Sequence, residues 1–204
     1  MKICLLGSTG RTGSAILKLL QENSHEISVL VRDKDKLSGE LIDIVEGDAR
    51  SKQDLLNAME NCDAVVSALS TDGGDLLSQA MPLIIEAMEE KKIKRIVTIG
   101  TAGILQSRTE PHLLRYESSE SRRKLTRAAE EHRAVYESLR KSGLDWTIVC
   151  PTYLPEGPAT GTYRMEEDRL PEGGSSISTG DTSEFAYRCL AEGLHIGKRV
   201  GIAY

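Results

Sequence analysis

Short apolar segments alternate with longer segments of helical periodicity along the chain. This alternation is typical of parallel strands joined by crossover helices. The apolar segments that we predict as strands span residues 2–6, 27–31, 42–45, 64–69, 95–99, 146–150 and 199–203. Apolar positions recur at helical spacing in residues 14–21, 51–59, 76–91, 120–142 and 181–192. We therefore predict an α/β fold, a single doubly wound Rossmann-type domain with a parallel sheet.

Two long segments show neither periodicity and are predicted as loops. Residues 100–118 are rich in polar and turn-forming residues, and residues 151–176 contain four of the six prolines. Loops of this length inside a compact domain commonly shape a binding site. We divide the predicted domain, residues 1–204, into a core over 1–150, a loop-rich substrate region over 151–180, and a terminal helix and strand over 181–204.

The composition excludes several classes of protein. The formal net charge is −5 and aromatic residues make up 4% of the chain, so no basic face or stacking surface for nucleic acid is expected. No apolar run approaches the roughly 20 residues of a membrane helix, and the chain begins with a strand-like segment instead of a signal-peptide pattern. Four scattered cysteines without a CxxC pair indicate reduced core thiols. We expect a cytoplasmic protein with no nucleic acid or membrane among its partners.

A glycine-rich turn directly after the first predicted strand carries the strongest chemical signal. The sequence Gly7-Ser-Thr-Gly10-Arg-Thr-Gly13 opens the first predicted helix. Gly7 permits a tight turn, Gly10 lets a pyrophosphate approach the backbone, and Gly13 lets the helix pack near the strand. A helix N-terminus attracts an anion, and the missing Lys-Ser/Thr pair argues against a Walker-type loop. The alternative is a glycine turn without a ligand. The residues that we predict to bind a dinucleotide here are Gly7, Thr9, Gly10, Arg11, Thr12 and Gly13.

The end of the second predicted strand bears on the choice of nicotinamide cofactor. An acidic residue there holds the ribose 2′-hydroxyl of NAD, whereas an arginine accommodates the 2′-phosphate of NADP. In this chain Arg32 comes first and Asp33 follows. The planar guanidinium of Arg32, with Arg11 from the glycine loop, favours NADP(H). NAD(H) is the alternative if Asp33 points inward instead.

Further cofactor-binding candidates follow the third and fourth predicted strands. Asp48 would accept a hydrogen bond from the adenine amino group, with the backbone at Ala49 reading the ring edge; alternatively, Asp48 is an ordinary turn residue. The small residues around Ala68, Leu69 and Ser70 would let a nucleotide approach the backbone. We include these residues because ligands bind outside the carboxyl ends of the strands in open α/β sheets.

Several of these segments resemble one family, the atypical short-chain dehydrogenases/reductases, and particularly its biliverdin reductase B and flavin reductase-like NAD(P)H-binding proteins. The resemblance rests on the glycine loop and on the sequences Val29-Leu-Val-Arg32-Asp33, Gly47-Asp48, Leu139-Arg-Lys-Ser-Gly-Leu-Asp-Trp-Thr-Ile-Val-Cys-Pro151 and Gly157-Pro-Ala-Thr-Gly161-Thr-Tyr163. It covers nearly the whole chain and implies a single-domain reductase that uses a reduced nicotinamide cofactor, with Pro151 at the cofactor.

The chain departs from the wider family at its catalytic pair. Many of those dehydrogenases use Tyr-x-x-x-Lys, and Ala129 and Arg133 occupy the corresponding places here. Alcohol dehydrogenation and sugar epimerisation through that tyrosine are therefore not expected. The resemblance instead suggests three catalytic candidates, which are Thr101 after the fifth strand, His132 in the long helix and Tyr153 after Pro151. Alternatively, Thr101 satisfies a turn and His132 is structural. His112, Tyr116 and Tyr163 lie in loops that the sequence does not place.

The function expected from these residues is hydride transfer from NAD(P)H to a flavin, a quinone or another planar small-molecule acceptor. Two alternatives remain. One is an NmrA-like redox sensor that binds the dinucleotide without turning it over, and the other is a sugar-nucleotide epimerase or dehydratase. No His/Cys/Asp set with metal-ligand spacing is apparent, so no metal is predicted. The sequence leaves open whether the protein is a monomer or a homodimer.

Overall fold

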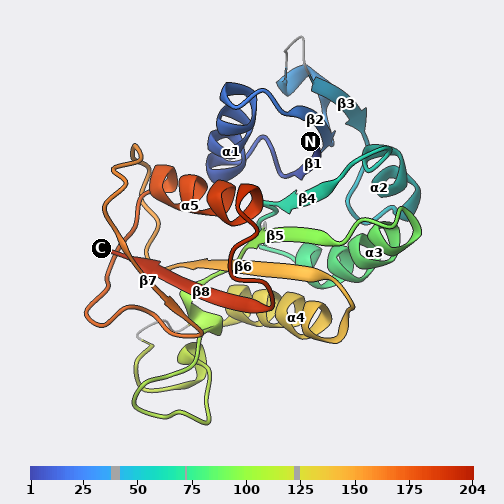
Figure 1. Cartoon of the computed structure of the whole chain (residues 1–204). Coiled ribbons are helices and arrows are strands. Elements are labelled where there is room, and N and C mark those ends of the chain that lie inside the picture. The colour runs from blue at the N-terminus through green and yellow to red at the C-terminus, as the bar shows by residue number, and fades with distance from the viewer. Residues whose placement is uncertain (38–41, 72, 122–124) are drawn as a thin grey trace.

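The computed structural model describes residues 1–37, 42–71, 73–121 and 125–204. All the strands form one eight-stranded sheet with the order β3-β2-β1-β4-β5-β6-β8-β7 (Figure 1). The strands are β1 (Lys2–Leu6), β2 (Glu26–Val31), β3 (Ile42–Glu46), β4 (Ala64–Ser67), β5 (Arg95–Ile99), β6 (Asp145–Pro151), β7 (Arg164–Glu167) and β8 (Lys198–Ala203). Every pairing is parallel except that of β7 with β8. The predicted doubly wound Rossmann-type fold is confirmed.

Helices cover both faces of the sheet. They are α1 (Arg11–Glu22), α2 (Lys52–Ala58), α3 (Leu76–Glu90), α4 (Arg127–Lys141) and α5 (Thr179–Ala191). Helices α1 and α5 pack together on one face, and α2, α3 and α4 cover the other (Figure 1). Each face has its own core. Ile16 and Phe185 belong to the first, and Ile84 and Leu139 belong to the second. No helix formed by the described residues is long and apolar enough to cross a bilayer.

The strand order reverses at β1, which lies between β2 and β4. The chain runs from β1 outward to β3 on one side and from β4 onward on the other. In open α/β sheets a ligand binds outside the carboxyl ends of the strands at such a reversal. The loops that follow β1, β2, β4, β5 and β6 therefore meet at the edge where a cofactor is expected.

The prediction of a helix over residues 120–142 is wrong at its start. Helix α4 begins at Arg127, with Thr126 as its N-cap, and residues 122–124 lie outside the described part of the chain. Leu125, which the helical pattern places on an apolar stripe, is 88% exposed. Glu120 instead accepts hydrogen bonds from the backbone N–H groups of Arg108 and Thr109, at 2.9 and 3.3 Å. Tertiary contacts of this loop thus override the local helical periodicity.

The C-terminal quarter also differs from the prediction. Helix α5 begins at Thr179 and is capped by Ser178, whose hydroxyl accepts from the N–H of Asp181 at 3.0 Å. Asp181, where the predicted helix begins, is instead buried inside the first turn of α5. The region predicted as loop contains β7, a strand that its mostly charged sequence, RMEE, does not signal. Backbone hydrogen bonds to β8 hold this segment as a strand, although its sequence lacks the apolar pattern by which strands are normally predicted.

The segment after β5, residues 100–121, is an ordered loop that we call the excursion after β5. Two 3-10 turns, η2 (Ala102–Ile104) and η3 (Arg115–Glu117), are joined by an isolated antiparallel bridge between Gln106 and Leu114. Glu110 fastens the far end by accepting hydrogen bonds from the N–H and the hydroxyl of Ser119, at 2.7 and 2.8 Å. This excursion forms one wall of the larger cavity described below.

Candidate functional site

The glycine turn after β1 is shaped by close backbone approaches. Gly7 has φ +82°, a region that favours glycine, and a Cβ added there would lie 2.6 Å from the carbonyl oxygen of Ala68. A Cβ at Gly13 would lie 1.9 Å from the carbonyl oxygen of Gly7. Gly10 is the N-cap of α1 and forms no side-chain capping bond. The first turn of α1 therefore presents its N–H groups with no side chain in front of them, as an anion site requires.

A cavity of about 180 Å³ lies beside this turn, at the carboxyl ends of β1 to β4. It is lined by Leu6, Gly7, Thr9, Gly10, Leu30, Val31, Arg32, Gly47, Asp48, Ala49, Arg50, Ala68, Leu69, Ser70 and Leu76. The fold thus brings together most of the residues predicted to bind the cofactor, from four different loops. We call this space the smaller cavity.

Arg32 and Asp33 differ in their surroundings. Arg32 lines the smaller cavity. The Oδ1 atom of Asp33 accepts a hydrogen bond from the N–H of Asp35 at 3.1 Å, where it caps the 3-10 turn η1 (Lys34–Lys36). The carboxylate of Asp33 also lies 3.7 Å from Nζ of Lys36. Of the two residues, the arginine is the one placed at the cavity.

Asp48 forms a two-pronged pair with Arg50. Nε and Nη2 of Arg50 donate to the two carboxylate oxygens of Asp48 at 3.0 and 2.8 Å, and the backbone N–H of Arg50 donates to Oδ1 at 2.8 Å. These bonds lower the pKa of Asp48 to about 2, so its carboxylate is charged at neutral pH. Sequence reasoning missed Arg50. Its signal is a cation two residues beyond an Asp at a strand end, which is common in ordinary turns.

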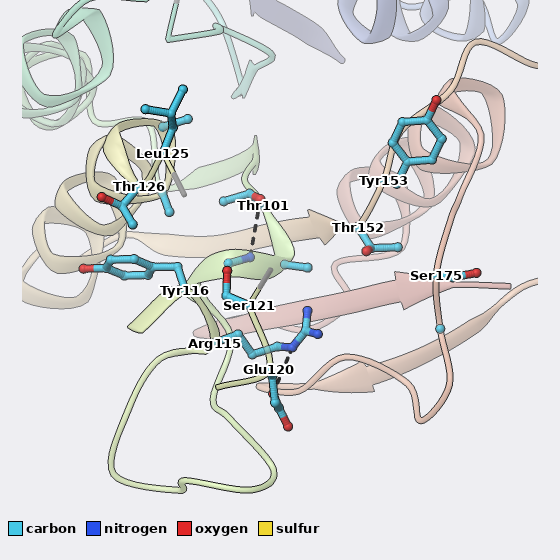
Figure 2. Close-up of a pocket in the computed structure, with 15 residues that line it drawn as sticks. Thr101, Arg115, Tyr116, Glu120, Ser121, Leu125, Thr126, Thr152, Tyr153 and Ser175 are labelled. Atoms are coloured by element: carbon cyan, nitrogen blue, oxygen red, sulfur yellow. Dashed lines mark hydrogen bonds and ion pairs between the residues drawn. The ribbon is translucent and has the colours of Figure 1, made fainter. Parts of the chain in front are cut away.

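A larger cavity of about 600 Å³ lies farther along the same edge of the sheet, beyond the carboxyl ends of β5 and β6 (Figure 2). It is lined by Thr101, Ala102, Gly103, Arg115, Tyr116, Glu120, Ser121, Leu125, Thr126, Ala128, Ala129, Thr152, Tyr153, Gly174 and Ser175. Its walls therefore come from the excursion after β5, the start of α4 and the C-terminal loops. Two of these three segments, the one after β5 and the C-terminal loops, include the residues that the sequence indicates as site-forming loops.

Two of the three catalytic candidates line this larger cavity. Thr101 caps η2, and its hydroxyl accepts a long hydrogen bond of 3.4 Å from the N–H of Gly103. Tyr153 lies across the cavity in Figure 2 and is 64% exposed. Both side chains are accessible from the cavity, and the single weak bond of Thr101 leaves its hydroxyl able to serve a ligand as well.

The third catalytic candidate, His132, is placed differently. It lies in α4 and lines neither cavity. Burial lowers its pKa to about 4, so the imidazole is neutral at physiological pH. A neutral ring away from both cavities fits the structural reading of this residue better than proton transfer.

The remaining predicted cofactor residues, Arg11, Thr12, Gly13 and Pro151, do not line the smaller cavity. Nη1 of Arg11 donates to the carbonyl oxygen of Leu154 at 3.4 Å. The carbonyl oxygen of Thr12 accepts from the hydroxyl of Ser183 at 3.2 Å, which joins the start of α1 to α5. Pro151 is the buried last residue of β6. The glycine loop is thus braced against the segment that leads away from β6.

The positions of the family tyrosine and lysine are occupied as the sequence indicates. Ala129 lines the larger cavity, so no phenol projects from that place in α4. Arg133 donates to the hydroxyl of Tyr116 at 3.0 Å and to Glu117 and Glu137 at 2.7 and 2.8 Å. The ring of Tyr116 forms part of the wall, while its hydroxyl points away from the cavity in Figure 2.

The larger cavity also contains an ion pair that sequence reasoning missed. Nε of Arg115 donates to Oε2 of Glu120 at 3.1 Å. Burial raises the pKa of Glu120, but hydrogen bonds from the Arg108 N–H, the Arg115 side chain and the Thr109 N–H outweigh burial, and the net shift is downward. Both residues lie in a loop without periodicity, so the sequence offers no signal that they meet. Within the described ranges, no cluster of three or more His, Cys, Asp or Glu side chains is arranged to hold a metal ion.

A family model with the description NAD(P)H-binding matches residues 7–193. The chain belongs to this NAD(P)H-binding family. The match begins at the first glycine of the turn and ends beyond α5, so it takes in both cavities. A nicotinamide cofactor is therefore the ligand of this fold, and the resemblance noted from the sequence is confirmed at that level.

The individual proteins that this chain resembles are distant from it in sequence. The uncharacterised protein YwnB of Bacillus subtilis is 26% identical over 191 residues, which covers 89% of this chain and 88% of YwnB. A solved structure of a candidate epimerase from Bacteroides thetaiotaomicron is 25% identical, with a TM-score of 0.86 over 100% of this chain and 96% of the other. A candidate NADH-flavin reductase from Streptococcus pneumoniae, 24% identical, has a TM-score of 0.83 over 100% of this chain and 99% of the other. The last likeness shows the shared fold.

Proposed function

We propose that this protein is an NADPH-dependent reductase that transfers a hydride to a flavin, a quinone or another planar acceptor bound in the larger cavity. The observation that carries the proposal is the pair of cavities along the carboxyl edge of the sheet, one at the glycine turn and one beyond β5 and β6. One is narrow and rich in backbone and arginine groups, and the other is about 600 Å³ in volume. A volume of that size suits a ring system of drug-like dimensions.

The glycine turn fits a dinucleotide. Apart from its chain neighbours, a Cβ at Gly10 would meet, among the described residues, only the carbonyl oxygen of Gly7 at 3.4 Å. The backbone at Gly10 is therefore bare on the side of the cavity that it lines. The N–H groups at the start of α1 would hold the pyrophosphate, and the residues after β3 and β4 would hold the adenosine half.

The choice of NADP(H) over NAD(H) rests on two arginines. Arg32 and Arg50 both line the smaller cavity, which gives a 2′-phosphate two cationic partners. Asp33, the residue that would hold a 2′-hydroxyl, is engaged in capping η1. These placements support NADP(H) as the preferred cofactor and leave NAD(H) as the weaker ligand.

In the reaction, the chain's own residues bind and orient the reactants. The bound reduced nicotinamide supplies the hydride when it is present. Thr101, at the end of β5, would orient the carboxamide or the acceptor through its hydroxyl, and Tyr153 would cover the stacked rings. Reduction of the acceptor by two electrons also consumes one proton, which we assign to solvent. The larger cavity opens to solvent at the exposed side chains of Tyr153 and Leu125.

An epimerase function finds less support, although relatives such as YhfK of Bacillus subtilis, 25% identical over 176 residues, are called sugar epimerases. Ala129 stands at the position where the wider family places its catalytic tyrosine. The side chain that would move the proton from a sugar hydroxyl is absent from that place.

The test is a steady-state assay of NADPH oxidation with FMN, riboflavin and a naphthoquinone as acceptors. Turnover with at least one of them, reduced by Tyr153→Ala without a change in NADPH affinity, supports the proposal. Tight binding of NADPH and NADP⁺ with equal affinity and no turnover would favour the NmrA-like sensor instead. Thr101→Val separates the two readings of Thr101, because a residue that only satisfies the turn would change the melting temperature and leave turnover intact.

A further inference from the structure

Arg115 is the cationic group among the described residues that line the larger cavity. Its side chain is 24% exposed and belongs to η3, in the middle of the excursion after β5. Figure 2 shows the guanidinium directed into the cavity, toward the side on which Thr152 lies. A charged group at such a place either stabilises the loop or binds a ligand, and its hydrogen bonds distinguish these two roles.

Glu120 is fully engaged by the loop. Its Oε1 accepts from the N–H groups of Arg108 and Thr109, and its Oε2 accepts from Nε of Arg115. The carboxylate is therefore fixed in place by backbone donors, independently of Arg115. The carboxylate of Glu120 contacts the guanidinium of Arg115 only at Nε, and this bond fixes the orientation of the guanidinium.

The other edge of the guanidinium is open. Neither Nη1 nor Nη2 of Arg115 donates to any residue in the described part of the chain. These two nitrogens form a planar fork of N–H donors, a geometry that matches the two oxygens of a carboxylate or a phosphate. Donors held in a fixed orientation by a third group need little reorganisation when a ligand arrives.

We propose that Arg115 determines the specificity of the larger cavity, and that the acceptor bound there carries an anionic oxygen group, a phosphate or a carboxylate, which the Nη1 and Nη2 atoms of Arg115 bind. Glu120 is a positioning residue that orients Arg115. This inference rests on the proposed reductase function and narrows its substrate class from planar acceptors to anionic ones.

The test compares three flavins that share one ring system. FMN carries a phosphate, 10-carboxymethylflavin carries a carboxylate, and riboflavin carries neither. Their dissociation constants are measured by flavin fluorescence on protein saturated with NADP⁺, so that no turnover occurs. We expect at least one anionic flavin to bind about 10-fold or more tighter than riboflavin, as a charge-assisted hydrogen-bond pair predicts. Which of the two binds tighter identifies the anion.

Variants of Arg115 and Glu120 test whether this pair causes the preference for anionic flavins. Arg115→Gln should remove the preference for the anionic flavins and leave riboflavin affinity within about twofold, since the lost bonds are those to the charged group. Arg115→Lys, which keeps the charge without the fork, should retain part of the preference. Glu120→Gln should reduce the preference while Arg115 is still present. Arg188→Gln, which removes an arginine paired with Glu184 and Glu192 on α5, is the matched control and should change nothing.

Equal affinity of the wild-type protein for all three flavins would overturn the inference, as would a preference that survives in Arg115→Gln. Binding of none of them in the presence of bound NADP⁺ would also overturn it. Failure of NADP⁺ to raise the melting temperature is a different result, because it removes the proposed function itself. The melting temperature of each variant shows whether it is folded.

Discussion

Arg32 lines the smaller cavity, whereas its neighbour Asp33 accepts a hydrogen bond from the N–H of Asp35 and caps the following 3-10 turn. An arginine at this place favours NADP and an acidic residue favours NAD. The two residues are adjacent in the chain but lie in different surroundings. Arg50 lines the same cavity from the loop after β3. In the proposed function, these two arginines are the residues that select the cofactor.

The first prediction concerns this selectivity. Arg32→Ala and Arg50→Ala should each weaken NADPH about 10- to 100-fold and NADH by no more than about threefold, because each removes charge-assisted hydrogen bonds to the 2′-phosphate. Dissociation constants from nicotinamide fluorescence provide the measurement. Arg188→Ala serves as the control, because Arg188 lines neither cavity and pairs with Glu184 and Glu192 on α5. Similar losses for both cofactors would show that the arginines contact another part of the dinucleotide.

A second prediction separates the roles of two glycines. A Cβ at Gly13 would lie 1.9 Å from the carbonyl oxygen of Gly7, so Gly13→Ala forces the backbone apart and should destabilise the protein by about 1–3 kcal/mol or more. At Gly10 the nearest non-adjacent atom lies at 3.4 Å, so Gly10→Ala should fold normally. It should nevertheless lose cofactor affinity, because the new methyl group lies where the pyrophosphate approaches.

Urea unfolding and cofactor titration together test the glycine prediction. Gly143→Ala is the control, since a Cβ there meets nothing within 4 Å in the described structure. Unchanged cofactor affinity in Gly10→Ala would place the pyrophosphate elsewhere.

A third prediction uses the lowered pKa of His132. Burial holds this pKa at about 4 in the folded protein, against an ordinary value of 6.5. Between these values the unfolded chain takes up a proton that the folded chain does not, so stability falls as the pH falls below about 6.5. From pH 7.5 to pH 5 the loss from this group should be about 2 kcal/mol.

The measurement is the free energy of unfolding in urea at both pH values, for the wild type and for His132→Gln. The variant should lose less stability than the wild type on acidification, by about that same 2 kcal/mol. An identical pH dependence in both proteins would contradict the burial of a neutral imidazole.

A fourth prediction concerns Asp181, which is fully buried and accepts hydrogen bonds from three segments. Its donors include the N–H groups of Thr160 and Gly161, at 2.7 and 2.8 Å, and the hydroxyl of Tyr204 at 2.6 Å. Asp181→Ala leaves several of these donors without a partner and should cost about 3 kcal/mol or more of stability. Tyr204→Phe removes one donor and leaves the others paired, so it should cost about 1 kcal/mol.

Both costs are measured by urea unfolding. Because Asp181 lines neither cavity, NADP⁺ affinity should stay within about twofold in Tyr204→Phe, which tests whether this cluster acts on stability alone. A loss of cofactor affinity equal to the loss of stability would show that the cluster also shapes the site.

The sequence predicts those parts of the fold and site that local rules determine. The strands are apolar runs, and the glycine turn and Arg32 follow strands directly, so their places on the sheet edge follow from connectivity. The ends of α4 and α5 could not be predicted in the same way. Glu120 is drawn out of the helical pattern by backbone donors from residues 108 and 109, and Asp181 is buried by partners at positions 160 and 204. Such contacts depend on the folded chain.

The same reasoning explains which cavity-lining residues the sequence could predict. Arg115 reaches the larger cavity through a loop whose path depends on the hydrogen bonds of Glu110 and Glu120. Arg50 lies in a short turn after β3, where its pairing with Asp48 has no distinctive sequence signal. His132 is the opposite case. A residue type suited to catalysis lies in α4, lines neither cavity and has a pKa lowered by burial. Residue chemistry without a position relative to a cavity therefore does not identify a catalytic group.

The antiparallel strand β7 has a consequence for association between molecules. It forms the outer edge of the sheet, and its side chains are already engaged: Arg164 with the carbonyl oxygens of Glu172 and Tyr204, Glu166 with Arg108, and Glu167 with His195 and Lys198. Charged side chains on an edge strand disfavour the addition of a further strand from another chain. The charged side chains of β7 therefore disfavour edge-to-edge growth of the sheet at this border.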